Sequence, residues 1–211
     1  MNIDSIAYSV KTRLPGLFDA TERATDRITV LRHKRARGEA LARADIDGRF
    51  DGSHAQIRPL ETADAVALHR FLSQMPPGHL KFFRPHDFSL PGIERSIASQ
   101  TRCSYGLFLS HELSGYALIK LFPTVRAYCG LIVSPGSAGR GLGKFLWRYL
   151  IWQCVLMGLV PCATVHVDNE SSLRSLRAVR PETERTPLAG DHLRLVIPVS
   201  ESDQACPELN L

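Results

Sequence analysis

The sequence predicts a mixed α/β domain, and three observations support this prediction. Two segments of strand-like pattern lie on either side of a short polar turn at residues 111–113, which is typical of a hairpin. Strand-like and helix-like segments then alternate as far as residue 198. A glycine-rich turn at 134–143 separates one such strand from an amphipathic helix. Hairpins followed by βα units indicate a mixed sheet with flanking helices.

Residues 1–54 are expected to form a basic, helical N-terminal extension. They are polar, and they contain a cluster of lysine and arginine side chains. Ile28, Leu31 and Leu41 fall near one helical face, which predicts a helix whose basic face lies in solvent. The turn-rich stretch at 45–53 follows, and we place the domain boundary there.

The catalytic-size domain is expected to span residues 55–200, followed by a C-terminal tail at 201–211. Its pattern predicts a short strand, a helix capped by Thr62, two hairpin strands, and then a strand, a helix, a strand, a helix and a last strand. In chain order these predicted elements are 56–60, 62–72, 105–110, 114–121, 126–133, 139–157, 162–167, 169–179 and 192–198.

Composition restricts the classes of protein to consider. At 211 residues, 44% hydrophobic and 22% charged, the chain suits one folded domain with an appendage. Its five cysteines form no C-x-x-C pair, so we expect reduced, mostly buried thiols and no metal. No signal-peptide or membrane-spanning pattern occurs, so a cytoplasmic protein is expected. The charge of +5 suits an anionic ligand without specifying one.

The glycine-rich turn carries Gly139, Gly141 and Gly143 directly before a helix. Glycine lets the backbone approach a phosphate closely, and the free N–H groups of a helix start attract negative charge. Arg140 and Lys144 add positive charge beside the same place. The glycine spacing is neither the G-x-G-x-x-G of dinucleotide folds nor a P-loop, which would need G-K-[ST]. A pyrophosphate of another cofactor class is therefore predicted here.

Two motifs together resemble the GNAT N-acetyltransferase superfamily. They are V-x-P-x-x-x-G-R-G-L-G over Val133 to Gly143, and Val165-His-Val-Asp-Asn-Glu-Ser-Ser-Leu-Arg-Ser-Leu176. The resemblance covers about residues 56–198. It implies a central twisted sheet with a splayed strand pair, acetyl-CoA as co-substrate, and transfer of an acetyl group to a primary amine by direct attack on the thioester.

The resemblance also implies which residues bind CoA. The pyrophosphate would lie on the glycine loop, and the pantetheine arm on the splayed strand. The start of the next helix would contact the same arm. The implied cofactor-binding residues are Gly139, Arg140, Gly141, Leu142, Gly143 and Lys144 in the loop, Leu131, Ile132 and Val133 in the strand, and Asn169 and Ser172 at the helix.

Two positions depart from the family pattern. Ala138 stands where members often carry Gln or Arg, so one phosphate-facing side chain is missing. Leu176 stands where many carry a Tyr that protonates the departing thiolate. A thiol of pKa about 8.5 leaves without an acid, so catalysis survives this loss. These departures leave open an alternative, a catalytically degenerate GNAT-like module that binds acyl-CoA or a partner protein without turnover.

The candidate bases for deprotonating the amine are His86 and His166. His86 belongs to the segment at 82–88, FFRPHDF, which we interpret as a substrate-recognition loop. The resemblance does not specify the acceptor, and a small molecule or amino sugar is slightly favoured over a protein. Nucleic-acid binding through the basic residues of 27–43 is an unfavoured third hypothesis, since aromatic residues are not interleaved there. The oligomeric state is open, and a dimer is possible.

Overall fold

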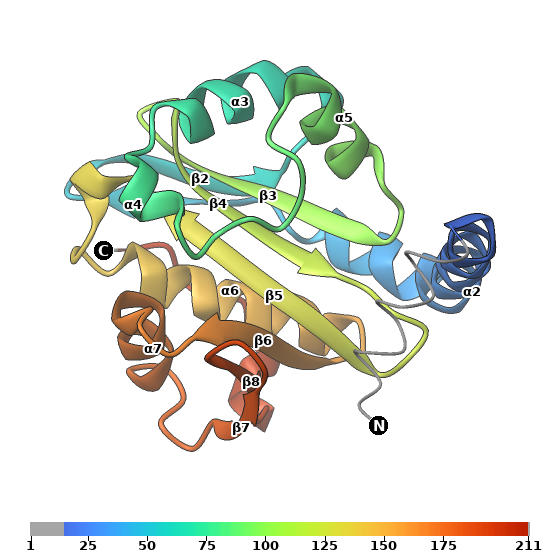
Figure 1. The fold of residues 1–211 in the computed structure, drawn as a ribbon. Coiled ribbons are helices and arrows are strands. Elements are labelled where there is room, and N and C mark those ends of the chain that lie inside the picture. Colours follow the sequence, from blue (N-terminus) through green and yellow to red (C-terminus); the bar gives the residue numbers. More distant parts are fainter. Residues whose placement is uncertain (1–14, 211) are drawn as a thin grey trace.

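The computed structural model describes residues 15–210, with side chains described from residue 24, and has one eight-stranded mixed sheet covered by helices on both faces (Figure 1). The first 14 residues of the expected extension lie outside the described part. The helices are α2 (Pro15–Ala42), α3 (Ala65–Ser73), α4 (Pro77–Leu80), α5 (Leu90–Ala98), α6 (Leu142–Leu156) and α7 (Glu170–Arg177). The strands are β1 (Ile46–Phe50), β2 (Ser53–Pro59), β3 (Arg102–Leu109), β4 (Glu112–Lys120), β5 (Arg126–Val133), β6 (Val160–His166), β7 (Glu184–Leu188) and β8 (His192–Val196).

The sheet runs in the order β1-β2-β3-β4-β5-β6-β8-β7, and its neighbours are antiparallel except for the parallel pair β5 and β6. The predicted mixed α/β fold is therefore confirmed. The predicted hairpin is β3 and β4, but its tight turn is Ser110-His111 and not 111–113. Both turn residues have positive φ, 47° and 70°, as a two-residue turn that matches strand twist requires.

Side chains of β4 show how one sheet serves two cores. Tyr116 and Leu118 point to the face covered by α3 and α5, whereas Ala117 and Ile119 point to the face covered by α6. Helix α6 is buried almost all round and supplies Trp147, Trp152 and other core residues.

Helix α2 packs with a different face from the predicted one. Ile28 is 56% exposed and Leu31 is 80% exposed, so the expected apolar face was wrong at these two residues, whereas Leu41 packs against the core. The buried side instead carries His33, whose Nε2 contacts the carbonyl of Phe122 at 2.9 Å, and the small residue Ala40. Small side chains let the helix lie close to its neighbours, so its packing does not require large apolar residues.

The stretch predicted to be a turn-rich boundary forms strand β1 and a tight turn into β2. Phe50 of β1 is buried in the same core as Ile57 of β2. Tyr149 of α6 donates a 2.6 Å hydrogen bond to the carbonyl of Ala44, which joins the end of α2 to the centre of the domain. Residues on both sides of position 54 thus share one core.

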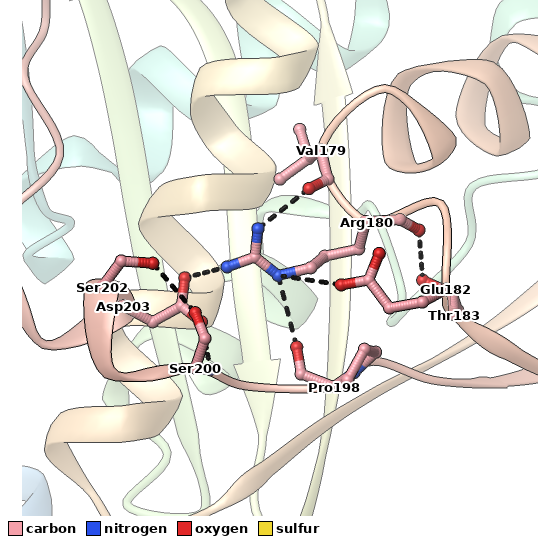
Figure 2. Close-up of polar contacts among 8 residues, drawn as sticks. All are labelled: Val179, Arg180, Glu182, Thr183, Pro198, Ser200, Ser202 and Asp203. Atoms are coloured by element: carbon pink, nitrogen blue, oxygen red, sulfur yellow. Dashed lines mark hydrogen bonds and ion pairs between the residues drawn. The ribbon is translucent and has the colours of Figure 1, made fainter.

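The C-terminal residues also pack on the domain. Arg180, just after α7, donates to the carbonyls of Val179 (2.9 Å) and Pro198 (3.3 Å) and forms an ion pair with Asp203 (Figure 2). Leu209 is buried, and its carbonyl accepts from the N–H of Arg49 in β1 at 2.7 Å. The tail therefore continues along the open edge of β1.

Candidate active site

Strands β5 and β6 form a fork. Their pairing runs from Arg126 opposite Val160 to Tyr128 opposite Cys162 and then stops, although β5 continues to Val133 and β6 to His166. In Figure 1 the two arrows separate towards the side of the molecule where α4 and α7 lie. The splayed strand pair expected from the resemblance is present.

The register of β5 shows which backbone groups face the fork. Ser134 N–H donates to the carbonyl of Ser114 in the β4 direction, and Val160 N–H donates to the carbonyl of Val125 in the β6 direction. Because bonded and non-bonded pairs alternate along an antiparallel ladder, odd-numbered residues of β5 turn their peptide groups towards β6. Beyond the fork point, the N–H and C=O of Leu131 have no protein partner within residues 15–210.

The glycine loop continues from the end of β5 into α6. Gly139 and Gly141 have φ values of 77° and 97°, a left-handed conformation that glycine adopts without steric cost. Within the described part of the chain, the backbone N–H groups from Gly139 to Gly143 have no protein acceptor. They converge at the N-terminus of a 15-residue helix, which is a site suited to a phosphate group.

The two basic side chains of the loop have different surroundings. Arg140 forms an ion pair with Asp51 and lies over the ring of Phe50 at 4.4 Å, so it is engaged with the β1–β2 hairpin. Lys144 is exposed at the cavity wall. The Leu142 side chain is fully buried in the core, so only its backbone N–H is available to a ligand.

Asn169 caps helix α7, because its side-chain oxygen accepts from the N–H of Ser172 at 3.2 Å. This use of the oxygen fixes the side chain and leaves the amide NH₂ as a donor. Nearby, Ser175 accepts from the indole N–H of Trp147 at 3.2 Å and so holds α7 against α6. Asn169, Ser172, Ser175 and Trp147 all line the same cavity.

The space between the separated ends of β5 and β6 is a cavity of about 830 Å³. It is lined by the open part of β5, the glycine loop, the facing part of β6, the start of α7, and α4 with the residues after it. Of the predicted cofactor-binding residues, the lining includes Leu131, Ile132, Val133, Gly139, Gly141, Gly143, Lys144, Asn169 and Ser172, and omits Arg140 and Leu142.

The two histidines predicted as bases do not line this cavity. His86 lies in the 82–88 loop, where Nε2 contacts the hydroxyl of Tyr116 at 3.0 Å. Burial lowers the pKa of His86 and raises that of Tyr116. His166 accepts the N–H of Asp168 on Nδ1 at 3.1 Å, and its ring stacks on Phe82. Their catalytic roles stay predictions.

His79 is the titratable side chain that the sequence analysis missed. It lies on the single turn of α4, lines the cavity, and donates from Nε2 to the carbonyl of Val133 at 2.8 Å. Phe82 and Phe83 line the same wall. The sequence signal was faint, because Pro76-Pro-Gly-His79 resembles an ordinary turn.

Leu176, which stands where many family members carry a Tyr, lies in the core, since it is 2% exposed and does not line the cavity. Within residues 15–210 no cluster of three or more His, Cys, Asp or Glu side chains is placed to hold a metal ion. The same residues include no helix with both the length and the apolar character needed to cross a membrane.

Comparison with known structures finds the same fold in several acetyltransferases. The GNAT domain of S. lividans PAT has a TM-score of 0.65 at 17% identity, over 74% of this chain and 97% of that one. Ribosomal-protein-S5-alanine acetyltransferase from Vibrio fischeri gives 0.60 at 16% identity, over 76% and 100%. AAC(6')-Ib in complex with paromomycin and acetyl-CoA gives 0.55 at 15% identity, over 71% and 94%.

Comparison of the sequence with family profiles agrees with the structural comparison. The chain matches no curated protein. The profile of the acetyltransferase (GNAT) family, however, matches residues 67–178, which is more than half of the chain and includes the fork, the glycine loop and all of α7. The chain belongs to the GNAT acetyltransferase family.

Proposed function

We propose that this protein is an acyl-CoA-dependent N-acetyltransferase that moves an acetyl group from acetyl-CoA to a primary amine. One observation carries the proposal: the fork between β5 and β6 leads directly into a glycine loop whose N–H groups from Gly139 to Gly143 have no acceptor among residues 15–210. A long ligand with an anionic end fits this combination, because the loop binds the anion and the open strand offers hydrogen bonds along the rest.

The glycine loop is assigned to the pyrophosphate of CoA. Its N–H groups donate to phosphate oxygens, and the positive end of the α6 dipole adds to the attraction. Lys144 supplies the nearby side-chain charge. Arg140, held by Asp51, contributes through its backbone N–H and long-range charge. Because Ala138 stands where many members carry Gln or Arg, one side-chain donor to the phosphates is missing. The backbone N–H donors of the loop are more numerous than this one lost donor.

The open part of β5 is assigned to the pantetheine arm and the acyl carbonyl. Leu131 presents both an N–H and a C=O to the fork, so it can pair with an amide of the arm as a neighbouring strand would. The amide NH₂ of Asn169 faces the arm from α7. A backbone N–H of this strand is also placed to stabilise the oxyanion when an amine attacks the thioester.

We propose His79 as the base, ahead of the two histidines predicted from sequence. An attacking amine must be neutral, and an imidazole at the cavity wall can take its proton directly or through one water. His79 donates from Nε2, so Nδ1 carries the lone pair. Binding of the pantetheine arm competes for the carbonyl of Val133, which would release His79 towards the acceptor.

The thiolate of CoA would leave without a protein acid. The position that could supply one holds Leu176 in the core. A thiol pKa of about 8.5 makes the thiolate a stable leaving group near neutral pH.

The acceptor is proposed to be a small amine or amino sugar, with protein N-termini as the second class to test. Asp168 and Glu170 are exposed at the cavity wall and attract a cationic amine. Phe82 lines the same cavity, and its ring already contacts His166 and Lys81, at centroid distances of 4.9 and 4.8 Å. A cytoplasmic location remains a prediction.

Release of free thiol from acetyl-CoA with a panel of amines tests the function. The panel contains polyamines, aminoglycosides, lysine and short peptides with free N-termini. We expect thermal stabilisation by CoA and turnover with at least one amine. Stabilisation without turnover on any amine would support the binding-module alternative, and no stabilisation would refute the CoA site.

A further inference from the structure

Two cysteine thiols meet at the point of the fork. Cys129 is the residue of β5 directly after the last pair with β6, and its Sγ lies 3.7 Å from Sγ of Cys154 on α6. Cys129 lines the cavity and is 7% exposed, whereas Cys154 is fully buried behind it. A reagent in the cavity can therefore reach Cys129 directly. It can reach Cys154 only by way of Cys129.

Cys129 also lies at the end of the cavity remote from the glycine loop. Val133 lies four positions after Cys129 on β5, which corresponds to about 13 Å of extended strand. With the pyrophosphate on the loop and the pantetheine arm along β5, the sulfur end of CoA points towards Cys129. This step rests on the proposed function, because it uses the orientation of CoA assigned there.

We propose that Cys129 is a site of covalent modification by CoA disulfide, and that Cys154 resolves the adduct. The Cys129 thiolate attacks one sulfur of the CoA disulfide, forming a Cys129–CoA mixed disulfide and releasing a CoA thiolate. Cys154 then loses its proton to water and attacks the Cys129 sulfur. The products are a Cys129–Cys154 disulfide and a second CoA thiolate.

Electrons balance in this sequence without another oxidant. The two protein thiols lose two electrons in total, and the disulfide bond of the CoA dimer accepts them. The contact of 3.7 Å must shorten to about 2.05 Å, the length of a disulfide bond. Cys129 lies beyond the strand pairing, where β5 has no β6 partner to restrain it.

The second step is expected to be the slower one. The hydrogen bond to Cys129, followed by burial, raises the pKa of Cys154, so little of it is thiolate at neutral pH. The mixed disulfide therefore persists long enough to be isolated. While it persists, the pantetheine groove is filled by a tethered CoA, and acetyl-CoA cannot enter until a thiol reductant removes it.

The test uses the full chain carrying Cys206→Ser, because Cys206 is the exposed thiol among the described residues. Intact-mass spectrometry follows treatment with CoA disulfide, and hydroxyethyl disulfide serves as the matched reagent without a nucleotide. The matched control variant is Cys162→Ser, which removes a buried thiol at the same fork that does not line the cavity. Thermal stabilisation by reduced CoA is measured for every variant.

We expect a CoA adduct that converts to a species lighter than the reduced protein by two hydrogen atoms. Cys154→Ser should stop at the adduct, Cys129→Ser should form neither product, and Cys162→Ser should behave as the parent. CoA disulfide should react at least about tenfold faster than hydroxyethyl disulfide, because binding concentrates it at Cys129. Acetyl transfer should fall in parallel and return with dithiothreitol.

Two failures can be told apart. If reduced CoA stabilises the protein but Cys129 stays unmodified, or if Cys129→Ser is modified equally, this inference is overturned and the proposed function stands. If reduced CoA gives no stabilisation, the proposed function fails. In that case, equal rates of reaction of Cys129 with CoA disulfide and with hydroxyethyl disulfide would overturn the inference as well, because they would show that recognition of CoA does not direct the reaction. Stabilisation of Cys129→Ser by CoA confirms that this variant folds.

Discussion

The proton that His79 would take from the acceptor is the most consequential detail at the scale of single residues. Its Nε2 donor and its Nδ1 lone pair have separable roles, one on Val133 and one towards the amine. Glutamine retains a donor but has no basic nitrogen. A substitution can therefore separate positioning from proton transfer.

His79→Gln is expected to lower kcat by about a hundredfold or more, the usual effect of losing a general base, with little change in KM for acetyl-CoA. The loss of rate at acidic pH that imidazole protonation causes should disappear in the variant. Steady-state rates across pH check this, with His54→Gln as the control, since His54 pairs with Asp47 and does not line the cavity. A normal pH profile in His79→Gln would exclude the role of base.

His86 makes a prediction about stability and pH. Its pKa is lowered by burial, with Arg102 adding a repulsion and Asp87 opposing it. The unfolded chain, whose histidine titrates near 6.5, then binds more protons than the folded chain below that pH. The stability that neutral His86 provides is present above pH 6.5 and is lost as the pH falls from there through the lower folded pKa.

Urea unfolding between pH 7.5 and 5.5, about one pH unit on either side of the reference histidine pKa, measures this loss. We expect His86→Gln to reduce the slope of stability against pH. The change should be well below the limit of about 1.4 kcal/mol per pH unit for one group, because water screens a half-buried ring. An unchanged slope would show that other groups carry the acid sensitivity.

At the scale of elements, the glycine loop depends on backbone conformation more than on space. Gly139 and Gly136 both have open space where a Cβ would lie, but only Gly139 has positive φ. The two positions thus form a matched pair. A difference between their alanine variants measures conformational strain alone.

Gly139→Ala is expected to destabilise the fold by about 1–2 kcal/mol and to weaken CoA binding, since the strained loop turns its N–H groups away from the phosphate. Gly136→Ala should change the unfolding free energy by less than about 0.5 kcal/mol. Thermal unfolding with and without CoA measures both effects. Equal behaviour of the two variants would contradict the conformational role of Gly139.

Elements of the fold differ in how far the sequence predicts them. Strands β3 to β6 and helices α3, α6 and α7 carry clear periodicity, because one or both of their faces are buried. Strand β7 is exposed along its whole length, so it has no pattern to detect. Helix α4 is a single turn that begins with proline, and no periodicity can develop over four residues.

The same contrast holds for the site. The glycine loop was expected at a helix start from the local sequence, and Asn169 from the family resemblance; both lie at helix starts, and their binding roles stay predictions. His79 was not predictable, since its relation to Val133 joins positions far apart in the chain through a turn of α4. Arg140 was assigned to phosphate from its neighbours in sequence, whereas the β1–β2 hairpin, which the sequence analysis did not predict, engages its side chain.

At the scale of the whole molecule, an ion pair connects the segment after α7 to the C-terminal tail. Arg180 and Asp203 have side chains 17% and 11% exposed, and Asp203 also accepts from the N–H of Ser200 at 2.7 Å (Figure 2). Removing one partner of such a pair leaves an uncompensated charge, which is costly when solvent is largely excluded.

Arg180→Ala is expected to cost about 3 kcal/mol in unfolding free energy. Arg177→Ala, an exposed arginine at the end of α7, is the control and should cost less than about 0.5 kcal/mol. The double variant Arg180→Ala with Asp203→Ala should be less destabilised than the sum of the single variants. Additive losses in denaturant unfolding would show that the two side chains are not coupled.

The path of the tail along β1 has a consequence for solubility. An edge strand presents unpaired N–H and C=O groups to any other chain that can extend the sheet. Here Leu209 and Asn210 lie against Arg49, and Gly48 permits this approach, since a Cβ there would fall 2.0 Å from the carbonyl of Leu209. Leu209 and Asn210 thus occupy an edge that would otherwise be open to pairing with another chain.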